Sequence, residues 1–480
     1  MALSWKANSG GDMKPAGAET DPSMLPNQSR LALSSAVDGP GPFGQIPEVQ
    51  ACGLANETEY PALFAAEVVR DAFRIATDRA LELVHVDPSR HDRARNLDGL
   101  ARTRPLKIVV VENESELGSH VRAWQDLADH AMEANVFYEP WLLRPALRTL
   151  TRDQPLRLVF IYEQEPLATA GVSRLCGFFP LEPVSRYQNL PIRAWRMWKH
   201  VHCFLCTPLL RRDRARDTLA ALLQWARASA GAHVVDFSSV RGDGPFHDLL
   251  REHAEETGAW QCVTNRYARA LWKQGRKFED YLQNTLSTGV RKEYRRQRRR
   301  LAELGSLEFR TLQNHADLDD WLDTFLDLEA SGWKAREGTA LGINASERAY
   351  VREAAREGFA RRQMVLQGLF LDGRAAAMLL SFLSGSGGFA FKIAYDENLA
   401  KFSPGVQIML DVMGYLHSNS RLAWMDSCAE PDHPMINRLW KDHKIIESVL
   451  CSTGHWLGDL AIMVYPAGRP LLQIIRGFRP

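Results

Sequence analysis

The chain has 480 residues, 45% of them hydrophobic, and a formal net charge of only +1. This length predicts two or three domains with substantial cores, and the near-neutral balance gives no overall sign of a polyanionic partner. The seven cysteines, an odd number, give no disulfide framework, and Cys203 and Cys206 lack the second pair that a zinc site of this kind needs. Residues 1–50 lack the apolar core of a secretion signal, and no apolar run reaches membrane-spanning length. We therefore expect a cytoplasmic protein with reduced thiols, with attachment to the inner membrane surface as an alternative.

The two ends of the chain are predicted to be tails. Glycine and proline gather in residues 1–55, which indicates disorder, whereas 61–84 has apolar residues at helical spacing. Residues 1–104 are therefore expected to form a disordered tail with one helix, which docks on the body or binds a partner. Residues 466–480 are expected to form a second tail.

Two units of similar order are predicted between the tails, at 105–270 and 271–465. For the first, the patterns predict a strand 106–111, a helix 114–134, strands 157–163 and 167–175, a helix 214–230, a strand 234–238, a helix 244–258 and a strand 260–271. For the second, they predict helices 277–304, 315–332 and 346–361, three strands, a helix from Pro404, a strand 423–426, a helix 434–440 and a strand 445–450.

The three strands of the second unit are the clearest local signal. They are expected at 366–371, 375–383 and 389–395, because Asp-Gly at 372–373 and the Gly/Ser run at 384–388 are turn sequences between apolar segments. An antiparallel meander is therefore predicted.

The segment after the meander predicts a helix with a well-defined start. Ser403 stands where an N-cap is expected, Pro404 at the first helical position, and Gly405 next to it. The first N–H groups of a helix lack internal partners and carry partial positive charge, so such a turn favours an anion. An ordinary strand-to-helix turn is the alternative interpretation.

The residues around this turn carry a family resemblance. They are Lys392, Tyr395 and Asp396, the Ser-Pro-Gly turn at 403–405, Asp426-Ser427-Cys428, Asp432-His433-Pro434, and upstream Ser331-Gly332-Trp333-Lys334 with a basic run at 291–300. In this pattern the chain resembles GNAT-like acyltransferases of the CelD/BcsL type, which are named for cellulose and exopolysaccharide biosynthesis. The likeness covers 270–465 well and 105–270 loosely, and the pairing of two units is also similar to the FemABX peptidyltransferases. It implies an α/β (α+β) fold of two GNAT-like lobes in tandem, each a mixed, mostly antiparallel sheet flanked by helices.

The resemblance also implies a function. An acyl-CoA-dependent N-acyltransferase, in the first instance an acetyltransferase, would act on a small or sugar-linked amine acceptor without a metal. The CoA pyrophosphate would lie on Ser403, Pro404 and Gly405, and backbone N–H groups of Ile393 and Tyr395 would polarise the thioester carbonyl. Trp333, Lys334 and Asp396 would border the acceptor. The matching junction of the first unit, placed at residues 206–208, lacks glycine, so the first lobe is expected to be degenerate.

Three polar residues are candidates for the chemistry. Asp426 ends a strand, where side chains point to the ligand crevice in such folds, and is a candidate general base or amine anchor. His433 is the alternative base because histidine titrates near neutrality, although a lone histidine is more often structural. Strand alternation predicts Lys392 on the face opposite Phe391 and Ile393, where it orients an anion or pairs with Asp396. A covalent route through Ser427 and Cys428 is disfavoured, because GNAT-type transfer is normally direct.

Two features keep other functions open. The segment 399–405 keeps only the last glycine of the GNAT signature Gln/Arg-x-x-Gly-x-Gly/Ala. The alternatives are therefore a FemABX-like transferase that uses aminoacyl-tRNA and a non-catalytic accessory protein of polysaccharide assembly. The basic run at 291–300 is either a solvated helix face or a contact for an anionic surface such as phosphates, acidic polysaccharide, lipid head groups or tRNA. Specific DNA binding is not expected, and no Walker, dinucleotide-binding or HExxH motif is present.

Overall fold

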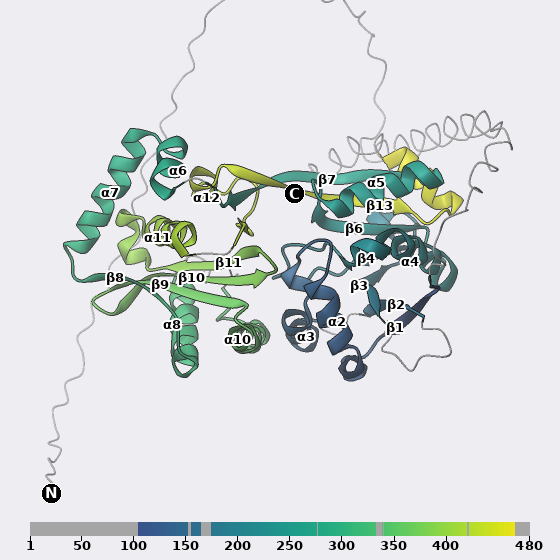
Figure 1. Ribbon diagram of the computed structural model, residues 1–480, viewed down its shortest axis with the longest axis horizontal. Helices are drawn as coiled ribbons and strands as arrows, with labels where there is room; N and C mark the ends of the chain where they lie inside the picture. The colour runs from purple at the N-terminus through teal and green to yellow at the C-terminus, as the bar shows by residue number, and fades with distance from the viewer. Residues whose placement is uncertain are drawn as a thin grey trace, which may run out of the picture. The chain divides into compact units, whose positions relative to one another are not determined.

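The computed structural model describes residues 104–151, 155–164, 174–275, 277–332, 338, 340–419 and 422–465. The predicted tail helix at 61–84 and the tail at 466–480 lie outside these residues. We call 104–275 the first half of the body and 277–465 the second half (Figure 1).

The described strands form one mixed sheet with the order β1-β2-β3-β4-β6-β13-β7-β12-β11-β10-β9-β8, and β5 pairs with β3 outside this order. They are β1 Leu106–Val111, β2 Arg157–Glu163, β3 Leu175–Val184, β4 Ala194–Met197, β5 Leu209–Leu210, β6 Val234–Arg241, β7 Gln261–Lys273, β8 Leu307–Thr311, β9 Met364–Leu371, β10 Arg374–Ser384, β11 Gly387–Tyr395, β12 Trp424–Asp426 and β13 Asp442–Ser452. Most neighbours pair antiparallel, and one parallel pair occurs in each half, β4 with β6 and β11 with β12. The predicted α/β class, with a mixed and mostly antiparallel sheet flanked by helices, is confirmed.

The helices flank this sheet. They are α2 Val121–Asp129, α3 Pro140–Thr149, α4 Ala215–Ala230, α5 Pro245–Thr257, α6 Phe278–Thr285, α7 Thr288–Ala302, α8 Leu318–Ala330, α10 Ala345–Ala360, α11 Pro404–Asn419 and α12 Ile436–Leu439, with 3-10 turns that include η2 Glu114–Ser119, η5 Arg212–Arg214 and η7 Glu397–Phe402. In the second half, α8 and α10 pack on one face of β9, β10 and β11, and α11 packs on the other with α6 and α7 (Figure 1). Two separate apolar clusters fill these two sides.

The halves exchange their last strands. The last strand of the first half, β7, pairs with β12 through Leu271, Trp272 and Lys273. The last strand of the second half, β13, inserts between β7 and β6 and pairs with both. The sheet is therefore continuous through the body.

Several predicted elements need correction. The helix predicted at 114–134 is a 3-10 turn followed by α2, which ends at Asp129. The helix predicted at 277–304 is broken at Leu286, which has extended geometry, and α7 restarts after Ser287, whose side chain accepts from the Val290 N–H. Strand β8 was not predicted. Strand β3 was not predicted either, and the predicted strand 167–175 falls almost entirely outside the described residues.

Candidate functional site

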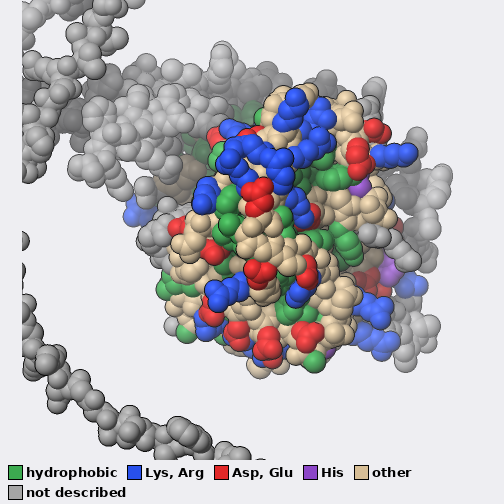
Figure 2. Space-filling view, turned by 90° about the vertical axis from the view of Figure 1, so that its left-hand side faces the viewer, with side chains coloured by type: hydrophobic (Ala, Val, Ile, Leu, Met, Phe, Trp, Pro, Cys, Tyr) green, Lys and Arg blue, Asp and Glu red, His purple; other side chains and the backbone are tan. Residues whose placement is uncertain are grey.

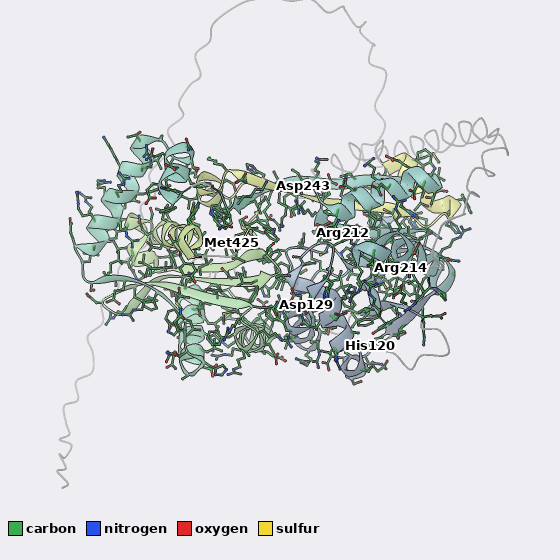
Figure 3. All side chains as sticks on the ribbon, in the orientation of Figure 1. His120, Asp129, Arg212, Arg214, Asp243 and Met425 are labelled. Atoms are coloured by element: carbon green, nitrogen blue, oxygen red, sulfur yellow. The ribbon has the colours of Figure 1, made fainter. Side chains whose placement is uncertain are left out.

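Strands β11 and β12 separate soon after they meet. Their parallel pairing covers only three residue pairs, from Gly387 opposite Trp424 to Phe389 opposite Asp426. Strand β11 then continues to Tyr395, whereas the chain leaves β12 through Cys428, which has a positive φ of 52°. Figure 3 labels Met425 on β12, just before this point. A gap between two neighbouring strands thus opens at their carboxyl ends.

A bulge shifts the side chains of β11 at the start of this gap. Leu380 of β10 pairs with Lys392, and Phe382 pairs with Phe389, so three steps along β11 oppose two along β10. Phe391 packs in the core on the α8 side, whereas Ile393 packs against the cluster on the α11 side. The prediction that Lys392 lies opposite both residues is therefore wrong, because the bulge breaks the alternation between them.

Beyond the bulge, the backbone N–H groups of β11 point alternately to its two sides. The N–H of Asp396 donates to the carbonyl of Ala376 at 2.9 Å, on the β10 side. In an antiparallel ladder alternate residues direct their N–H groups to the same neighbour, so those of Ile393 and Tyr395 point to the β12 side. These two residues are the ones predicted to meet the acyl group.

The turn after β11 is built as a capped 3-10 segment. The Asp396 carboxylate accepts from the Asn398 N–H at 2.9 Å and caps η7. Ser403 follows with φ 53° and ψ 54°, which is left-handed rather than the extended geometry of an ordinary N-cap. Helix α11 then begins at Pro404, as predicted.

Few backbone donors remain at this helix start. The carbonyl of Ser403 accepts from the N–H groups of Val406 and Gln407, at 2.9 and 3.0 Å. Proline has no N–H. Within the described residues, the N–H of Gly405 is therefore the donor of this first turn that makes no backbone hydrogen bond.

Gly405 brings the predicted cofactor-binding residues together. A Cβ on Gly405 would lie 3.4 Å from Met435 Sδ, 3.6 Å from Tyr395 Cδ1 and 3.8 Å from Ile393 Cδ1. The turn at 403–405 thus lies against the end of β11 and against the loop that carries His433.

Asp426 lies in a buried ion cluster. Its side chain is fully buried, 3.0 Å from Lys444 Nζ and 3.7 Å from Arg269 Nη1, and accepts from the Cys428 N–H at 2.9 Å. Burial alone would raise the pKa of Asp426, but Lys444, Arg269 and the Cys428 N–H outweigh it and lower that pKa below its usual value. A buried, paired carboxylate of this kind is a weak proton acceptor.

His433 has a more open environment than Asp426. Its side chain is half-buried. Its ring Nδ1 accepts from the Ile436 N–H at 3.4 Å, next to α12. His433 precedes Met435 by two residues and is therefore close to the Gly405 turn. Of the two predicted bases, it is the one carried by the loop whose Met435 lies beside Gly405.

A loop of the first half reaches the bulge and was not predicted. Residues 198–208 connect β4 to β5, and within this loop His202 Nε2 lies 2.9 Å from Glu347 Oε2 of α10. The His202 ring stacks on Tyr350 and meets Phe391 edge-on. Burial, with smaller contributions from Lys392 and His200, lowers the pKa of His202 to about 3, so the ring is neutral at pH 7. No sequence signal joins two residues so far apart in the chain.

The remaining predicted site residues differ in outcome. Lys392 is half-buried on the α8 side, where its positive charge helps to lower the pKa of His202 and opposes the rise in the pKa of Cys428 that burial causes. Trp333 and Lys334, predicted to border the acceptor, lie outside the described residues.

A cavity of about 570 Å³ lies away from this site, between η5, α4 and α5 (Arg212 and Arg214 in Figure 3). Three arginines and four carboxylates line it, and Arg216 pairs with Glu252 at 2.7 Å. Because these arginines and carboxylates offset one another, the lining of the cavity does not favour binding of an anion. Helix α4 begins here, at Ala215, so the helix junction predicted at residues 206–208 is wrong: those residues precede β5.

The described part of the chain lacks two features. No group of three or more His, Cys, Asp or Glu side chains there could hold a metal ion. No helix there is long and apolar enough to cross a membrane.

Comparison with known proteins identifies one region. Residues 288–433 match a family model described as an acetyltransferase (GNAT) domain. This matched part of the second half holds β11, β12 and the α11 turn, and its sequence is similar to GNAT acetyltransferase domains. No curated protein matches the chain.

Solved structures show remote similarity. FemX is 10% identical with a TM-score of 0.46, over 72% of this chain and 96% of its own. A conserved protein of unknown function from Bacteroides thetaiotaomicron is 10% identical with a TM-score of 0.43, over 73% and 99%. A tandem GNAT protein from the clavulanic acid biosynthesis pathway is 15% identical with a TM-score of 0.34, over 73% and 99%. At these values none of the three carries an inference about activity.

Proposed function

We propose that the protein is an acyl-CoA-dependent N-acyltransferase of the CelD/BcsL type, which acetylates an amine on a small or sugar-linked acceptor. The observation that carries this proposal is the separation of β11 from β12 beside the start of α11, inside the region that matches the GNAT model. A thioester needs an extended slot with backbone donors on one side and an anion-tolerant turn at its outer end. The gap and the Gly405 turn offer both.

The proposed reaction is direct transfer. The pyrophosphate of acyl-CoA lies at the Gly405 N–H, and the N–H groups of Ile393 and Tyr395 face the carbonyl oxygen of the thioester. The neutral amine attacks the carbonyl carbon, and negative charge develops on that oxygen. The C–S bond then breaks, which gives an amide and the CoA thiolate, and the amine releases one proton. Alignment of the two bound groups supplies much of the acceleration.

His433, rather than Asp426, is proposed to take part in the proton transfer. Asp426 is fully buried, paired with Lys444, and has a lowered pKa, so it accepts a proton poorly. His433 is half-buried and lies on the loop whose Met435 flanks the turn. A His433→Gln variant is expected to keep acyl-CoA affinity and to lose most of its activity. Unchanged activity in this variant would remove His433 from the mechanism.

Calorimetric titration with acetyl-CoA tests the proposal. Gly405→Ala is the informative variant, because the added methyl group would meet Met435, Tyr395 and Ile393 at ordinary contact distances, so the protein should still fold. In the proposed complex the same methyl group crowds the phosphate at the Gly405 N–H. A matched control is Gly289→Ala, at the second position of α7, where a Cβ meets nothing within 4 Å. We expect wild type and control to bind and Gly405→Ala to bind at least about tenfold more weakly. Failure of the wild type to bind acetyl-CoA would refute acyl-CoA dependence.

A second candidate donor is an aminoacyl-tRNA. The observation in its favour is the small number of backbone donors at the α11 turn, because Pro404 has none and Val406 and Gln407 donate to Ser403. This candidate predicts no binding of acetyl-CoA and transfer of a labelled amino acid from charged tRNA to the acceptor. If neither result is obtained and the protein transfers an acyl group from acyl-CoA, this candidate is refuted.

A further inference from the structure

Helix α7 carries a dense cationic surface. Seven of the ten residues at 291–300 are arginine or lysine, and Figure 2 shows Lys and Arg side chains gathered on the side of the molecule that holds α7. Three have acidic partners: Arg296 with Glu293, Arg298 with Asp411 and Arg299 with Glu303.

Three other exposed cations of α7 lie outside these ion pairs. Lys292, Arg295 and Arg300 are exposed and form no ion pair with another described residue. Like charges along one helix repel, so the sequence bears a cost here that an external anion would remove. The outer face of α7 is thus complementary to a negatively charged partner.

An apolar groove runs beside these cations. It has a volume of about 200 Å³ and lies between α6, α7 and α11. The apolar side chains that line it are Phe278, Leu282, Leu286, Tyr294 and Leu410, and the cationic ones are Arg291, Arg295 and Arg298. All but Leu286 of the apolar group are only half-buried. The groove therefore joins open hydrocarbon surface directly to a cationic rim.

We propose that this face binds an anionic phospholipid of a membrane surface, with an acyl chain in the groove and the phosphate at Arg291 and Arg295. The combination of apolar groove and cationic rim matches a molecule with a hydrocarbon chain and a charged head, which free phosphate does not have. A polybasic helix gains affinity from anionic lipid, and buried methylene groups add to it.

Nucleic acid is the less favoured partner of this face. Single-stranded nucleic acid is held by aromatic side chains that present open ring faces for base stacking. Three leucines line the groove beside three arginines, Gln407 and Asp411, and its two rings, Phe278 and Tyr294, are half-buried between helices. The charge pattern alone would suit either partner, so the apolar lining decides.

The groove adjoins the candidate site. Helix α7 packs against η7, and Gln407 of α11 donates from its side chain to the Tyr294 carbonyl at 3.1 Å. Gln407 follows Gly405 by two residues. A protein held to a membrane by this groove would therefore keep the α11 turn close to the lipid surface.

Co-sedimentation of the full chain with vesicles tests the proposal. Phosphatidylcholine vesicles are compared with vesicles that also contain phosphatidylglycerol. We expect binding only to the anionic vesicles, and on the order of a hundredfold weaker binding by the variant Lys292→Gln/Arg295→Gln/Arg300→Gln, because each basic residue near such a surface contributes a factor of about five. The control replaces three exposed arginines elsewhere, Arg122, Arg186 and Arg374, by glutamine and should bind like wild type.

A groove variant and a nucleic-acid arm complete the test. Leu282→Glu places a charge on the apolar lining, and we expect it to lose vesicle binding while its thermal unfolding stays cooperative. Equal binding of both vesicle types, wild-type binding by the triple α7 variant, or unchanged binding by a folded Leu282→Glu would each overturn the proposal. So would binding of tRNA in place of anionic vesicles with the same dependence on α7. Vesicle binding needs no acyl transfer, so this proposal and the proposed function can fail separately.

Discussion

Replacement of Asp426 by asparagine should destabilise the fold rather than simply stop a reaction. The carboxylate is fully buried and lies 3.0 Å from Lys444 Nζ, which is itself 3% exposed. Asparagine keeps an acceptor for the Cys428 N–H but leaves Lys444 as a buried charge without its anion. Breaking one side of a buried ion pair costs about 3–5 kcal/mol. A domain is typically stable by only about 5–15 kcal/mol, so the loss should be easy to measure.

A double variant separates charge from packing. Asp426→Asn/Lys444→Met removes both charges of the pair and keeps the length of the lysine stem, although it also removes Lys444 Nζ, which lies 4.1 Å from the centroid of the Trp424 ring. Arg269 retains the Phe204 carbonyl and the Tyr267 hydroxyl as partners, each at 2.8 Å. We therefore expect the double variant to be more stable than Asp426→Asn alone.

Urea titration followed by tryptophan fluorescence and circular dichroism measures both changes. The pKa of Asp426 is lower in the folded than in the unfolded state, so its stabilisation is complete at neutral pH. It is lost as the pH falls through the folded pKa, and the asparagine variant should lack this acid dependence. An Asp426→Asn protein with the wild-type urea midpoint but no acyl transfer would refute this reasoning and return Asp426 to the role of general base.

Three further outcomes follow from local geometry. Gly358→Ala should destabilise the protein by about 1–3 kcal/mol and so lower its thermal midpoint, because the added Cβ would lie 2.7 Å from Trp141 Cζ3. This loss outweighs the better helix propensity of alanine. A raised midpoint would show that α10 can shift. Ser403→Gly should stabilise the protein by about 1 kcal/mol in the same measurement, because the φ of 53° at this serine is a strained, left-handed geometry that glycine adopts freely. A lower thermal midpoint would contradict this strain. Burial lowers the pKa of His200 and of His202 to about 3, so the unfolded state binds more protons between pH 3 and about 6.5. Stability should therefore decrease as pH falls below about 6.5, by up to about 1.4 kcal/mol per pH unit for each histidine, and His202→Gln should make the slope shallower in urea titrations at several pH values.

Local signals predicted the part of the fold nearest the site. The Asp-Gly turn at 372–373 and Pro404 each fix the backbone within a few residues, and the meander and the start of α11 lie where these signals place them. The Gly405 turn also lies beside Ile393 and Tyr395, which the same reasoning grouped with it. Their roles toward a ligand stay predictions.

Non-local features could not be predicted in this way. The bulge in β11 depends on how Phe382 of the neighbouring strand pairs, and no residue in β11 predicts it. The Asp426 and Lys444 pair joins two strands brought together by the path of β13, so Asp426 alone suggested an accessible base. The contact of His202 with Glu347 depends on a loop from the first half. In each case the deciding partner is distant in sequence.

The exchange of β7 and β13 has a consequence for synthesis on the ribosome. Strand β6 needs β13 as its neighbour, and the pairing of Val234 with Ser452 joins residues more than two hundred positions apart. Such pairings form late because a long loop must close first. The first half therefore emerges with an open sheet edge that its own residues do not cover, and that edge invites pairing with other chains until the last strand has been made. Other nascent chains on the same messenger RNA are the nearest source of a strand that could pair wrongly with this edge. Slow synthesis of the second half would therefore lengthen the time during which such mispairing can occur.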